Sequence, residues 1–527
     1  MKILTSQQMR RAEEICAGRG IPPSVLMENA GRVVAEEVRR VLGGSFRRVI
    51  VLVGPGNNGG DGEVAARYLK GWGYDVSLLI LERRPRDDEN LELARRSTIP
   101  VIQYGDQTAG SVEALLGSAD VVIDAVFGTG FKVAANGQSA RPMSKSVTSV
   151  LSLVRSNKED RPDLIIFALD LPSGLDPDTG AVSEATLFAD ETITLGFPKV
   201  GLFNMPGSER AGMISIADIG IPADAVAETV PELMTALGVK AILPRRPRVA
   251  NKGTFGKAML MAGSKNYVGA ACLACSGALR VGAGLVTLAS PDSLHSIMAT
   301  KLTEVTHLPL PESSPGILAP EAQAAVRNGL QGYDVLLVGC GMGQSESTAA
   351  NVRALLLGRP KLNLPCIIDA DALNILSSLD EGGQVWRRLS SDVILTPHPG
   401  EMSRITGISV EAIQNDRISV AASTAAKLNK TVVLKGAYTV VAAADGRIAV
   451  SPFANAALAS AGTGDVLAGA IAGFVAQGLP LFEASVAGVY VHGKAGELLA
   501  HDFGDAGVIA GDLLPCLPKA IKQIRGS

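Results

Sequence analysis

The sequence lacks the cysteine spacing of a zinc protein. Its 527 residues contain six cysteines, which are scattered along the chain. The only close pair is Cys272 and Cys275, and no second pair stands where a zinc site would need one. We therefore expect the cysteines to be buried small apolar side chains.

Long apolar segments are also missing. Residues 1–14 mix charged and polar side chains with few apolar ones, so they contain no signal-peptide core. The longest apolar stretch of interest, residues 466–476, ends at Gln477 and is too short to span a bilayer. These absences predict a protein of the reducing cytoplasm with no membrane partner.

Charge of one sign does not dominate the chain. The formal net charge is -3 and the pI is about 6.1, which leaves no global field that favours nucleic acid or an anionic membrane. The basic and aromatic surface pattern of an RNA-binding protein is absent as well. No nucleic-acid partner is expected, and any anionic ligand must be held by local groups.

The residues that are present predict a compact α/β protein. A hydrophobic fraction of 47%, with 58 glycines and 28 prolines, fits a fold with many short turns, and the length favours two domains. Short apolar runs alternate with longer helical patterns, which predicts parallel sheets covered on both faces. The predicted strands are residues 49–53, 76–81, 121–125, 164–169 and 192–195 in the first half, and 258–262, 285–288, 335–338, 367–369, 393–395 and 432–434 in the second. We place the domain boundary near residues 220–235, in a segment rich in proline.

A glycine-bracketed turn with one carboxylate stands out in the second half. Residues 460–467 read SAGTGDVL and run into an apolar, helix-like stretch. Such a turn directs free backbone N–H groups and the positive end of a helix at one point, where a phosphoryl group can sit beside the acid Asp465. The motif alone is weak, because a glycine before a helix can simply close a turn.

The surroundings of this turn favour a ligand site. Residues 431–435 predict a buried strand, Gly436 a turn, and residues 438–443 a hairpin partner. A further strand at 392–396 stops at the sequence PHPGE. Open α/β sheets bind their ligands at such strand ends.

The first half carries a second concentrated signal. A strand at residues 49–53 is followed by GPGNNGGDG at residues 54–62 and then by a helical pattern. Five glycines in this loop allow the backbone to approach a ligand closely, and the helix offers its first amides to phosphate. The spacing matches neither G-x-G-x-x-G nor a P-loop, and a sharp structural turn would need only one or two glycines.

Two further strand ends carry carboxylates. Asp124 precedes the sequence FGTG, and Asp170 precedes PSG, so both are expected to line one crevice with the glycine-rich loop. Carboxylate, amide and hydroxyl oxygens there could hold a hard cation, or one carboxylate could move protons. Either aspartate taken singly could instead be a turn former that satisfies local N–H groups.

In the order in which they occur, these motifs resemble those of the bifunctional NAD(P)H-hydrate repair enzymes, in which an epimerase domain precedes an ADP-dependent dehydratase domain. Similar to the epimerase are GNNGGDG (56–62), DAVFGTG (124–130), LDLPSGLDPDTG (169–180) and FPKVGL (197–202). Similar to the dehydratase are KGTFGKAMLMAGS (252–264), TPHPGEMSRI (396–405), VLKG (433–436) and AGTGDVLAG (461–469). The resemblance covers nearly the whole chain. It implies a Rossmann-like three-layer αβα epimerase domain at residues 1–220 and a ribokinase-like α/β dehydratase domain at residues 228–524.

For the first domain, the resemblance implies interconversion of the R and S forms of hydrated NADH and NADPH (NADHX and NADPHX), which carry a hydroxyl on C6 of the reduced nicotinamide ring. Asp170 would contact the ligand near this ring and is our predicted acid/base. Potassium would be held by Asn58, Asp124 and Ser173. The other residues implied to bind the hydrated dinucleotide are Asn57, Asn58, Gly59, Gly60, Asp61, Gly128, Thr129, Gly130, Phe131, Lys132, Val133 and Ala134.

For the second domain, the resemblance implies dehydration of the S form with ADP as co-substrate, which yields AMP and phosphate. Asp465 would take the proton from the C6 hydroxyl, the glycine turn would stabilise the transferred phosphoryl group, and magnesium would neutralise the remaining charge. The residues implied to face the dinucleotide are Ala270, Gly341, His398 and Asp465. Those implied to hold ADP or ATP are Lys435, Gly436, Ala437, Tyr438, Thr439, Asn455, Ala456, Ala457, Leu458, Ala459, Ser460, Ala461, Gly462, Thr463 and Gly464.

The chain departs from the family pattern at three places. Glu63 stands where the family tends to have a large apolar residue, and Cys340 stands where a proline is usual. Residues 455–458 (NAAL) replace a version richer in glycine and proline, which predicts a change in nucleotide affinity rather than in chemistry.

Two other functions fit parts of the sequence. One is a small-molecule kinase of ribokinase type with an appended Rossmann-like module, which would leave a stable phosphorylated product. The other is a first domain that only binds a protein or RNA, and the intact polar residues of its two loops argue against it. By analogy with the family, an even-numbered homo-oligomer is expected.

Overall fold

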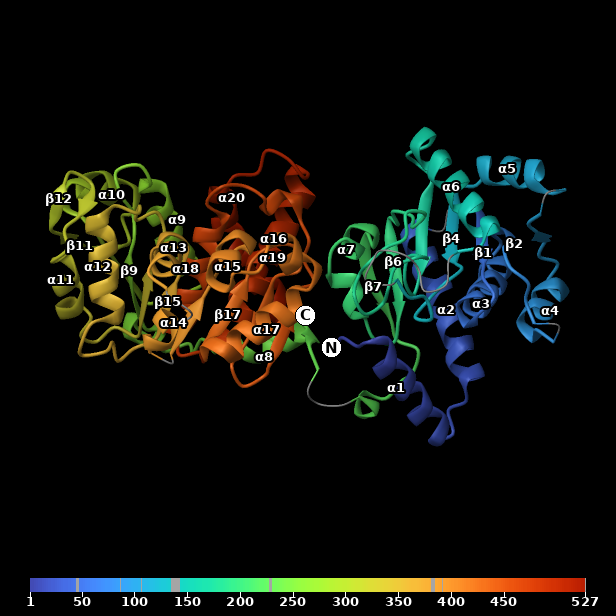
Figure 1. Ribbon diagram of the computed structural model, residues 1–527, viewed down its shortest axis with the longest axis horizontal. Coiled ribbons are helices and arrows are strands. Elements are labelled where there is room, and N and C mark those ends of the chain that lie inside the picture. Colours follow the sequence, from blue (N-terminus) through green and yellow to red (C-terminus); the bar gives the residue numbers. More distant parts are fainter. Residues whose placement is uncertain are drawn as a thin grey trace. The chain divides into compact units, whose positions relative to one another are not determined.

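The computed structural model describes residues 1–526 except 44–46, 86, 106, 134–142, 227–229, 381–383 and 391. Internal contacts divide the chain into an N-terminal unit, Met1–Val230, and a C-terminal unit, Pro231–Ser527. The N-terminal unit runs from blue to green in Figure 1 and the C-terminal unit from green to red. Within the described residues, none of the helices combines the length and the apolar character needed to cross a membrane.

The N-terminal unit is built on a seven-stranded sheet in which every neighbouring pair is parallel. The strand order is β3-β2-β1-β4-β5-β6-β7. The strands are β1 (Arg48–Val53), β2 (Asp75–Ile80), β3 (Val101–Gln103), β4 (Val121–Ala125), β5 (Ile165–Leu169), β6 (Glu191–Leu195) and β7 (Met213–Ala217). The strands expected at 49–53, 76–81, 121–125, 164–169 and 192–195 are confirmed to within one residue at either end.

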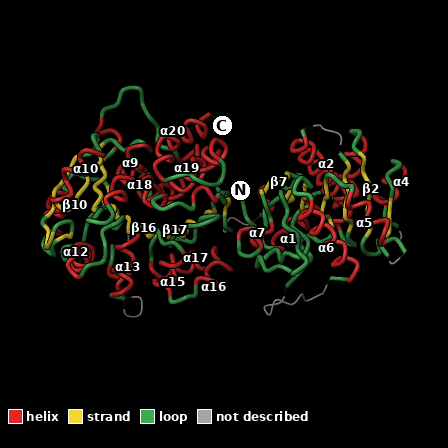
Figure 2. Tube along the Cα trace, turned by 90° about the horizontal axis from the view of Figure 1, so that it is seen from above, coloured by secondary structure: helices red, strands yellow, loops and turns green. Residues whose placement is uncertain are grey.

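Helices cover both faces of this sheet, as Figure 2 shows from above. Alternate strand residues point to opposite faces. Val49 and Val51 enter a core with α1, α2 and α3, whereas Ile50 and Leu52 enter one with α5 and α6. The helices are α1 (Ser6–Gly18), α2 (Pro23–Leu42), α3 (Asn57–Gly71), α4 (Glu89–Arg96), α5 (Ala109–Gly117), α6 (Lys145–Asp160) and α7 (Gly207–Arg210), with the short 3-10 helices η1 (Val200–Phe203) and η2 (Ala223–Ala225). The unit is therefore the three-layer αβα fold that the sequence predicts.

The C-terminal unit contains a ten-stranded sheet of order β11-β10-β9-β14-β15-β16-β17-β18-β19-β8. Pairing is parallel from β11 through β17 and antiparallel for β17-β18 and β18-β19. The strands are β8 (Glu232–Leu233), β9 (Lys257–Met261), β10 (Leu285–Pro291), β11 (Thr306–Leu310), β14 (Val335–Val338), β15 (Cys366–Ile368), β16 (Val393–Leu395), β17 (Thr431–Leu434), β18 (Val440–Ala442) and β19 (Ile448–Val450), with a separate hairpin of β12 (Glu312–Ser314) and β13 (Ile317–Leu318).

The helices of this unit also form two layers, and its fold class is the mixed α/β architecture predicted for it. One core unites α8, α9, α18, α19 and α20 with one face of the sheet, and another unites α11 to α14 with the opposite face. The helices are α8 (Ala236–Ile242), α9 (Val268–Arg280), α10 (His295–Lys301), α11 (Ala322–Gly329), α12 (Glu346–Leu357), α13 (Ala370–Ser378), α14 (Gln384–Arg388), α15 (Pro399–Thr406), α16 (Val410–Asn415), α17 (Arg417–Leu428), α18 (Thr463–Ala476), α19 (Leu481–Phe503) and α20 (Ala510–Gly526), with η3 (Lys252–Phe255), η4 (Asp292–Leu294) and η5 (Ala456–Leu458).

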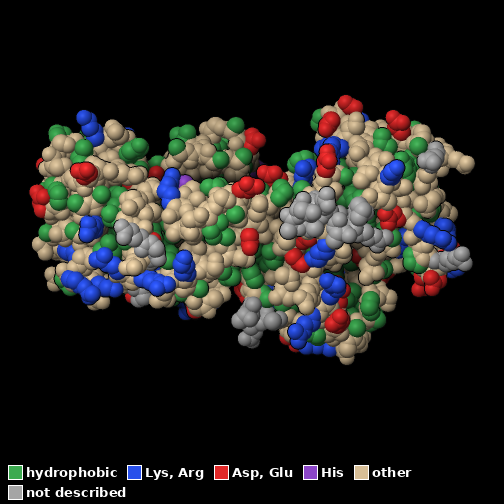
Figure 3. All heavy atoms as spheres, viewed as in Figure 1, with side chains coloured by type: hydrophobic (Ala, Val, Ile, Leu, Met, Phe, Trp, Pro, Cys, Tyr) green, Lys and Arg blue, Asp and Glu red, His purple; other side chains and the backbone are tan. Residues whose placement is uncertain are grey.

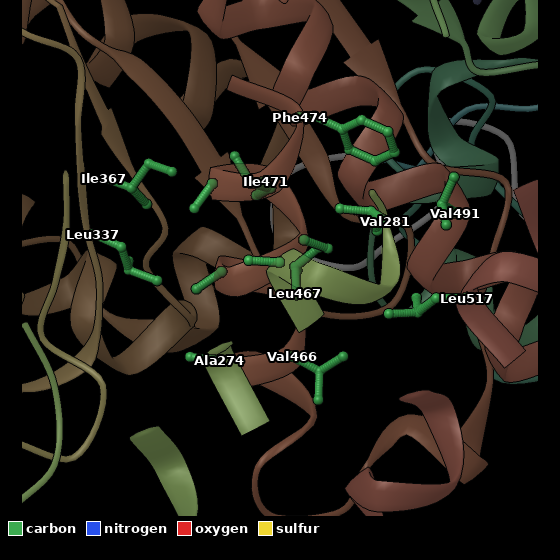
Figure 4. Packing of buried hydrophobic residues seen from close by; sticks show 14 of the residues in the cluster. Ala274, Val281, Leu337, Ile367, Val466, Leu467, Ile471, Phe474, Val491 and Leu517 are labelled. Atoms are coloured by element: carbon green, nitrogen blue, oxygen red, sulfur yellow. The ribbon is translucent and has the colours of Figure 1, made fainter. Parts of the chain in front are cut away.

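Helix α18 is apolar around most of its circumference, and it is accordingly buried on several sides. Figure 4 shows Val466, Leu467, Ile471 and Phe474 among side chains from α9, α19, α20 and the central strands. Gly469 permits this packing, because a Cβ there would lie 2.0 Å from the carbonyl oxygen of Ala274 in α9. The start of α18, and with it Asp465, is therefore fixed by the core.

Figure 3 shows both acidic and basic side chains on the visible face of each unit, with several basic ones along the lower edge of the C-terminal unit. This distribution agrees with a formal net charge of -3. Recognition of an anion must therefore depend on groups inside a site rather than on a charged surface.

Candidate active sites

The glycine-rich loop of the N-terminal unit follows β1 and leads directly into α3. Its glycines allow close backbone packing: a Cβ at Gly54 would lie 1.9 Å from the Val126 carbonyl oxygen, and one at Gly59 would lie 2.3 Å from the Gly54 carbonyl oxygen. Asn57, the first residue of the helix, is exposed, while Asn58 and Asp61 in the same turn are 8% and 7% exposed. The loop thus directs two polar side chains inward.

Asp124 and Ser173 form a buried hydrogen-bonded pair at the ends of β4 and β5. The Ser173 hydroxyl donates to Asp124 Oδ1 at 2.5 Å, and the Ser173 backbone N–H donates to Oδ2 at 2.8 Å. The same hydroxyl accepts from the Phe127 N–H at 2.8 Å. Burial raises the pKa of Asp124, and the hydrogen bonds from Ser173 partly offset that rise.

Asp170 follows β5 in the left-handed backbone region, with φ of 67°. Its Oδ1 accepts hydrogen bonds from the fully buried ammonium of Lys199 and, at 3.1 Å, from the Leu195 N–H. Its Oδ2 turns toward Gly128, where an added Cβ would lie 3.2 Å from both Asp170 Oδ2 and Asn58 Oδ1. The structure therefore brings Asn58, Gly128 and Asp170 together.

Two further acids share this charge cluster. Burial and then the charge of Asp170 raise the pKa of Asp61 well above its usual range, and the charges of Glu13 and Lys199 also act on it. Burial likewise raises the pKa of Glu13, against the opposing effect of Lys199. Lys199 and Glu13 are missing from the predicted site. Lys199 lies within the FPKVGL motif, whereas no local pattern marks Glu13, which comes from the distant helix α1.

Residues 128–133 of the predicted ligand loop are held mainly by contacts with neighbouring residues. The Phe131 ring stacks on Phe127 with ring centroids 5.4 Å apart. Lys132 forms an ion pair with Asp178, and the Val133 N–H donates to Asp176 at 3.0 Å. Thr129 and Gly130 form the turn before Phe131, and Ala134 lies outside the described residues.

Arg84 supports the glycine-rich loop through hydrogen bonds to its backbone. Arg84 donates to the carbonyl oxygens of Gly54 at 3.0 Å and Gly56 at 2.7 Å. It also forms ion pairs with Glu63 at 3.1 Å and Asp88 at 2.5 Å. Glu63 is completely buried, and burial raises its pKa to about 7 although Arg84 opposes the rise.

In the C-terminal unit, four neighbouring parallel strands end in polar groups. Cys340, Asp369, Thr396 and Lys435 follow β14, β15, β16 and β17. Asp369 Oδ1 accepts from Lys435 Nζ at 2.6 Å and from Thr396 Oγ1 at 2.7 Å. Because parallel strands end at one edge of the sheet, these groups form a continuous row.

Asp465 lies in the first turn of α18, close to this row. Gly462 takes a φ of 91° before the helix, and a Cβ at Gly464 would lie 3.6 Å from Lys435 Nζ. Burial and then the charge of Asp369 raise the pKa of Asp465 to about 6, while a hydrogen bond from Cys340 and the charge of Lys435 oppose that rise. The helix start, the ammonium of Lys435 and one carboxylate thus converge.

Hydrogen bonds from buried groups stabilise the turn before Asp465. The Thr463 hydroxyl donates to the carbonyl oxygens of Leu458 and Ser460, both at 2.9 Å. His492 in α19 lies 2.9 Å from the Thr463 carbonyl oxygen. Burial lowers the pKa of His492 to about 4, so the ring is neutral and its Nε2–H donates this bond. His492 lies outside every predicted motif.

His398 has a local role at the start of α15. Its Nδ1 accepts from the backbone N–H groups of Gly400 at 3.0 Å and Glu401 at 3.3 Å, and Glu401 in turn accepts from the His398 N–H at 2.8 Å. This reciprocal capping box satisfies amides at the helix start. Burial lowers the pKa of His398, and the charge of Lys435 adds to the effect.

Two more residues predicted to face the dinucleotide meet at the far end of the row. Gly341 has a φ of 63°, and a Cβ there would lie 2.7 Å from the Cβ atoms of both Ala270 and Tyr267. Ala270 in α9 and Gly341 after β14 are therefore in direct contact, beside Cys340.

The segments predicted to hold the adenine nucleotide form two adjoining turns. The first, residues 435–439, is closed by a hydrogen bond from the Thr439 hydroxyl to the Gly436 carbonyl oxygen at 2.8 Å. The second, residues 455–464, begins where Asn455 caps η5, and it is tied to residue 508 by Ser460 Oγ, which donates to the Val508 carbonyl oxygen at 2.6 Å. Ala437 and Tyr438 belong to the first turn, and Ala456, Ala457, Leu458, Ala459, Ala461, Gly462, Thr463 and Gly464 to the second.

A buried arginine supports the first of these turns. Arg417, which is 1% exposed, donates to the carbonyl oxygens of Leu434 at 3.0 Å and Lys435 at 3.1 Å. Its other terminal nitrogen donates to Gln414 at 2.5 Å. Burial lowers the pKa of Arg417 to about 10. Sequence reasoning missed this support, because Arg417 lies in helix α17 outside every predicted motif.

Comparison with known proteins finds a matching family for each part of the chain. A family model described as NAD(P)H-hydrate dehydratase matches residues 258–519, and one described as YjeF-related protein N-terminus matches residues 23–201. A protein of Moorella thermoacetica named bifunctional NAD(P)H-hydrate repair enzyme Nnr is 38% identical over 99% of this chain and 97% of its own length. The chain belongs to the family of bifunctional NAD(P)H-hydrate repair enzymes.

Other members of this repair enzyme family are similar over comparable lengths. The Escherichia coli protein of the same name is 32% identical over 98% of this chain and 93% of its own length. Among solved structures, the ADP/ATP-dependent NAD(P)H-hydrate dehydratase from Bacillus subtilis, co-crystallised with ATP and Mg2+, is 32% identical with a TM-score of 0.46. It covers 56% of this chain and 100% of its own.

The structure accounts for one departure from the repair enzyme pattern. Glu63, in place of a large apolar residue, fills its buried position by pairing with Arg84, which in turn holds two carbonyl oxygens of the glycine-rich loop. An ion pair therefore fills this buried position at the entry to α3.

Proposed function

We propose that this chain repairs hydrated nicotinamide cofactors. The domain at residues 1–220 interconverts the R and S forms of NADHX and NADPHX, and the domain at residues 228–524 dehydrates the S form to NADH or NADPH while ADP becomes AMP and phosphate. The observation that carries the proposal is the position of Asp465, a carboxylate with a pKa of about 6, in the first turn of α18 beside Lys435.

Dehydration needs a better leaving group than hydroxide. Asp465 is largely ionised at neutral pH. It takes the proton of the C6 hydroxyl while the oxygen of that hydroxyl attacks the terminal phosphorus of ADP. The bond from phosphorus to the bridging oxygen breaks, and AMP leaves. The lone pair of the ring nitrogen then expels phosphate from C6, and loss of a proton from C5 restores the double bond of NADH.

Lys435 and the start of α18 stabilise the charge that develops on the phosphoryl group. The Lys435 ammonium lies close to Gly464, and the amides of the first helical turn are directed to the same point. The ion pair with Asp369 keeps this ammonium at the strand end. The residues of both turns, 435–439 and 455–464, hold ADP, with ATP as the alternative co-substrate.

Magnesium fits the same place. When bound, it supplies positive charge to the phosphate oxygens. Glu401 is the carboxylate we assign to it, because this side chain is 4% exposed and burial raises its pKa, so a cation there would stabilise its charged form. Ala270, Gly341 and His398 face the dinucleotide in this assignment.

In the epimerase domain, we assign proton exchange to Asp170. Lys199 holds one of its carboxylate oxygens, while the other turns toward Gly128 and Asn58. Asn58 Nδ2 is buried and has no hydrogen-bond partner among the described residues, which suits an amide that awaits a ligand acceptor. The hydrated dinucleotide lies along Asn57 to Asp61 and Gly128 to Ala134 in this proposal.

Potassium suits the neighbouring oxygen groups. Its ligands would be Asn58, Asp124 and Ser173, which offer amide, carboxylate and hydroxyl oxygens of the kind that hard cations prefer. Burial raises the pKa of Asp124, so a cation there would stabilise its charged form. The positive charge would also favour an anionic substrate nearby.

The decisive experiment supplies the protein with both epimers of hydrated NADH and with ADP or ATP, and follows the near-ultraviolet absorbance of the reduced ring. We expect both epimers to be converted fully to NADH, with one phosphate released per turnover. Recovery limited to the S epimer would contradict the epimerase assignment. A stable phosphorylated product without NADH would support the alternative, a ribokinase-type kinase with a non-catalytic first domain.

Location and assembly are parts of the same proposal. We assign the enzyme to the cytoplasm, where its substrates arise, with no nucleic-acid partner. We also propose an even-numbered homo-oligomer. Light scattering of the full chain tests the assembly, because an odd-numbered or monomeric species would contradict it.

A further inference from the structure

A cluster of three side chains joins the predicted ligand loop of the N-terminal unit, residues 128–134, to the start of α1. Lys132 Nζ forms an ion pair with Asp178 and donates to the Ser6 hydroxyl at 2.9 Å. Ser6, the first residue of α1, in turn donates to Asp178 through its N–H at 2.5 Å and through its hydroxyl at 2.8 Å. We call Ser6, Lys132 and Asp178 the clasp.

A second carboxylate fastens the loop beside the clasp. Asp176 accepts from the Val133 N–H at 3.0 Å with one oxygen, and from the N–H groups of Asp178 and Thr179 at 2.9 and 3.0 Å with the other. Its backbone packs closely on the segment after Lys199, because a Cβ at Gly201 would lie 2.2 Å from the Asp176 carbonyl oxygen. The loop is therefore attached to a well-packed part of the fold.

The α1 side of the clasp is fixed as well. Thr5 caps α1 and forms a reciprocal capping box with Gln8. Leu4 pairs with Lys199 in an isolated parallel bridge, through backbone hydrogen bonds of 2.9 and 3.1 Å to the residues on either side of the lysine. One short segment thus contacts both the clasp and the backbone of the lysine that holds Asp170.

The ligand loop runs from the proposed acid/base to the clasp. Gly128, at its start, faces Asp170 Oδ2 and Asn58 Oδ1, each 3.2 Å from a Cβ added at Gly128. The Phe131 N–H donates to the Gly128 carbonyl oxygen at 3.2 Å and closes a turn, and Lys132 follows directly. The clasp therefore determines where the backbone of this turn lies relative to Asp170.

The charge of Lys132 is balanced inside the clasp. The side chains of Lys132 and Asp178 are 37% and 30% exposed, so the ion pair is partly shielded from water. Burial alone would raise the pKa of Asp178, but the hydrogen bonds from Lys132 and Ser6 outweigh it and lower the pKa. The positive end of α1 favours the ionised carboxylate too. A phosphate of the dinucleotide would have to compete with this carboxylate for the ammonium.

We propose that the clasp positions the ligand loop of the epimerase: Asp178 and Ser6 hold the Lys132 ammonium, so that the loop meets the hydrated dinucleotide with its backbone and not with the lysine charge. Ser6, Lys132 and Asp178 are positioning residues in this role. The proposal rests on the proposed epimerase function of the N-terminal unit and deepens it.

The test is kcat and KM for R-to-S conversion of hydrated NADH by the full chain, measured for wild type, Asp178→Asn, Lys132→Met and the double variant. Each single variant opens the clasp and should raise KM by about 5- to 10-fold, with kcat changed by less than about twofold. The double variant should be no worse than the worse single variant, because both substitutions break one interaction. Lys132→Arg keeps a cation opposite Asp178 and should hold KM within about twofold of wild type.

The matched controls are Lys158→Met and Asp190→Asn. These two residues form a lysine–aspartate ion pair of 3.0 Å in the same unit, with side chains 27% and 42% exposed. Asp190 directly precedes β6, so it lies at the sheet edge opposite to the one where Asp170 follows β5. Neither control should change KM or kcat. Urea unfolding shows whether each variant is folded, and if Asp178→Asn is not, Lys132→Met and Lys132→Arg give the comparison.

The opposite role for Lys132, binding of the dinucleotide phosphates, predicts a different pattern. Asp178→Asn would then release the ammonium and lower KM, while Lys132→Met would raise it. A lowered KM in Asp178→Asn, or an unchanged KM in both single variants, overturns the proposal. So does a double variant whose effect is the product of the two single effects. A wild type that does not interconvert the epimers would instead contradict the proposed function, so the two failures are distinguishable.

Discussion

The two units solve one electrostatic problem in different ways. Each pairs a lysine with an aspartate that follows a parallel strand: the fully buried Lys199 with Asp170, and Lys435, whose side chain is 16% exposed, with Asp369. In the N-terminal unit, the paired aspartate is itself the proposed acid/base. In the C-terminal unit, the lysine pairs with a supporting aspartate, and the proposed base, Asp465, lies on a separate helix. The ion pair is therefore part of the chemistry in one unit and a scaffold for it in the other.

The arginines that support the two loops, Arg84 and Arg417, also differ in the charge of their partners. Arg84 holds two loop carbonyl oxygens while two carboxylates neutralise it. Arg417 also holds two carbonyl oxygens, but its further partner is the neutral Gln414, and burial lowers its pKa to about 10. A ligand loop is thus held by an arginine that pairs with two carboxylates in one unit, and by an arginine that hydrogen-bonds to a neutral amide in the other.

The largest effect expected is that of Asp465→Asn. Removal of the base should lower the rate of dehydration by about 10³-fold or more, because general base catalysis typically contributes 10² to 10⁴. Epimerisation should remain at the wild-type rate, since this carboxylate belongs to one unit only. Separate assays of NADH recovery and of epimer exchange test the prediction.

The control for this variant is Asp502→Asn, which changes an exposed acid of the same unit. It should leave both activities intact. Equal loss of the two activities in Asp465→Asn would contradict the separation of the sites.

Lys199→Met comes next. It leaves Asp170 buried without its partner, which should cost about 3–5 kcal/mol of unfolding free energy and remove epimerase activity. The double variant Lys199→Met, Asp170→Asn should recover part of that stability but not the activity. Urea unfolding, with epimerisation and dehydration assayed at each step, measures both effects.

An equal loss of dehydration in Lys199→Met would show that the damage spreads beyond the N-terminal unit. Full epimerase activity in this variant would show that the ion pair is only structural. Either result would remove the contrast between the two lysine–aspartate pairs.

Asp124→Ala should lower the epimerisation rate by about 100-fold and abolish its dependence on potassium, because the carboxylate is the only charged member of the proposed ligand set. Dehydration should be unaffected. Epimer exchange measured across a series of potassium concentrations tests this, with the exposed Asp163→Ala as the control. An unchanged rate of S-to-R conversion would rule out the assigned cation site.

The smallest effect concerns Glu63. Its folded pKa of about 7 lies above its usual value of 4.5, so the folded protein holds a proton that the unfolded chain releases between these two values. Stability from this group is therefore fully present below about pH 4.5, falls as the pH rises to about 7, and is level above that. In Glu63→Gln, the change in unfolding free energy between about pH 4.5 and pH 7 should be smaller than in wild type by about 1–3 kcal/mol.

Urea unfolding of wild type and Glu63→Gln at several pH values gives the measurement, and Glu14→Gln serves as a control near the surface. Parallel curves for the two proteins across the whole range would show that Arg84 keeps Glu63 ionised at every pH. In that case, Arg84 would face two ionised carboxylates, Glu63 and Asp88, at every pH tested.

Much of the fold could be predicted from local patterns. Strands at 121–125, 335–338 and 393–395 are confirmed residue for residue, because buried parallel strands are short continuous apolar runs. The start of α18 at Thr463 was also legible, since glycine and an acid mark a helix start. Short or half-exposed strands such as β3 and β7 were missed, because their sequences carry no comparable signal.

Site residues that directly follow strands could be predicted from the sequence. Site residues that come from distant helices or loops could not. Asp124, Asp170 and Lys435 could be found because strand ends in an open sheet meet at one edge. Glu13, Arg84, Arg417 and His492 reach the sites from helices or loops distant in sequence, and only tertiary packing brings them there.

The strand β8 gives the boundary between the units a practical meaning. The C-terminal unit begins at Pro231, and β8 follows at once. Its residues Glu232 and Leu233 pair with Ala449 and Val450 and form the outer edge of the ten-stranded sheet. A fragment of the C-terminal unit that starts at residue 235 would expose the edge of β19, and exposed strand edges promote aggregation. A fragment that starts at residue 231 would keep this edge covered, so the choice of four residues would decide whether the isolated dehydratase stays in solution.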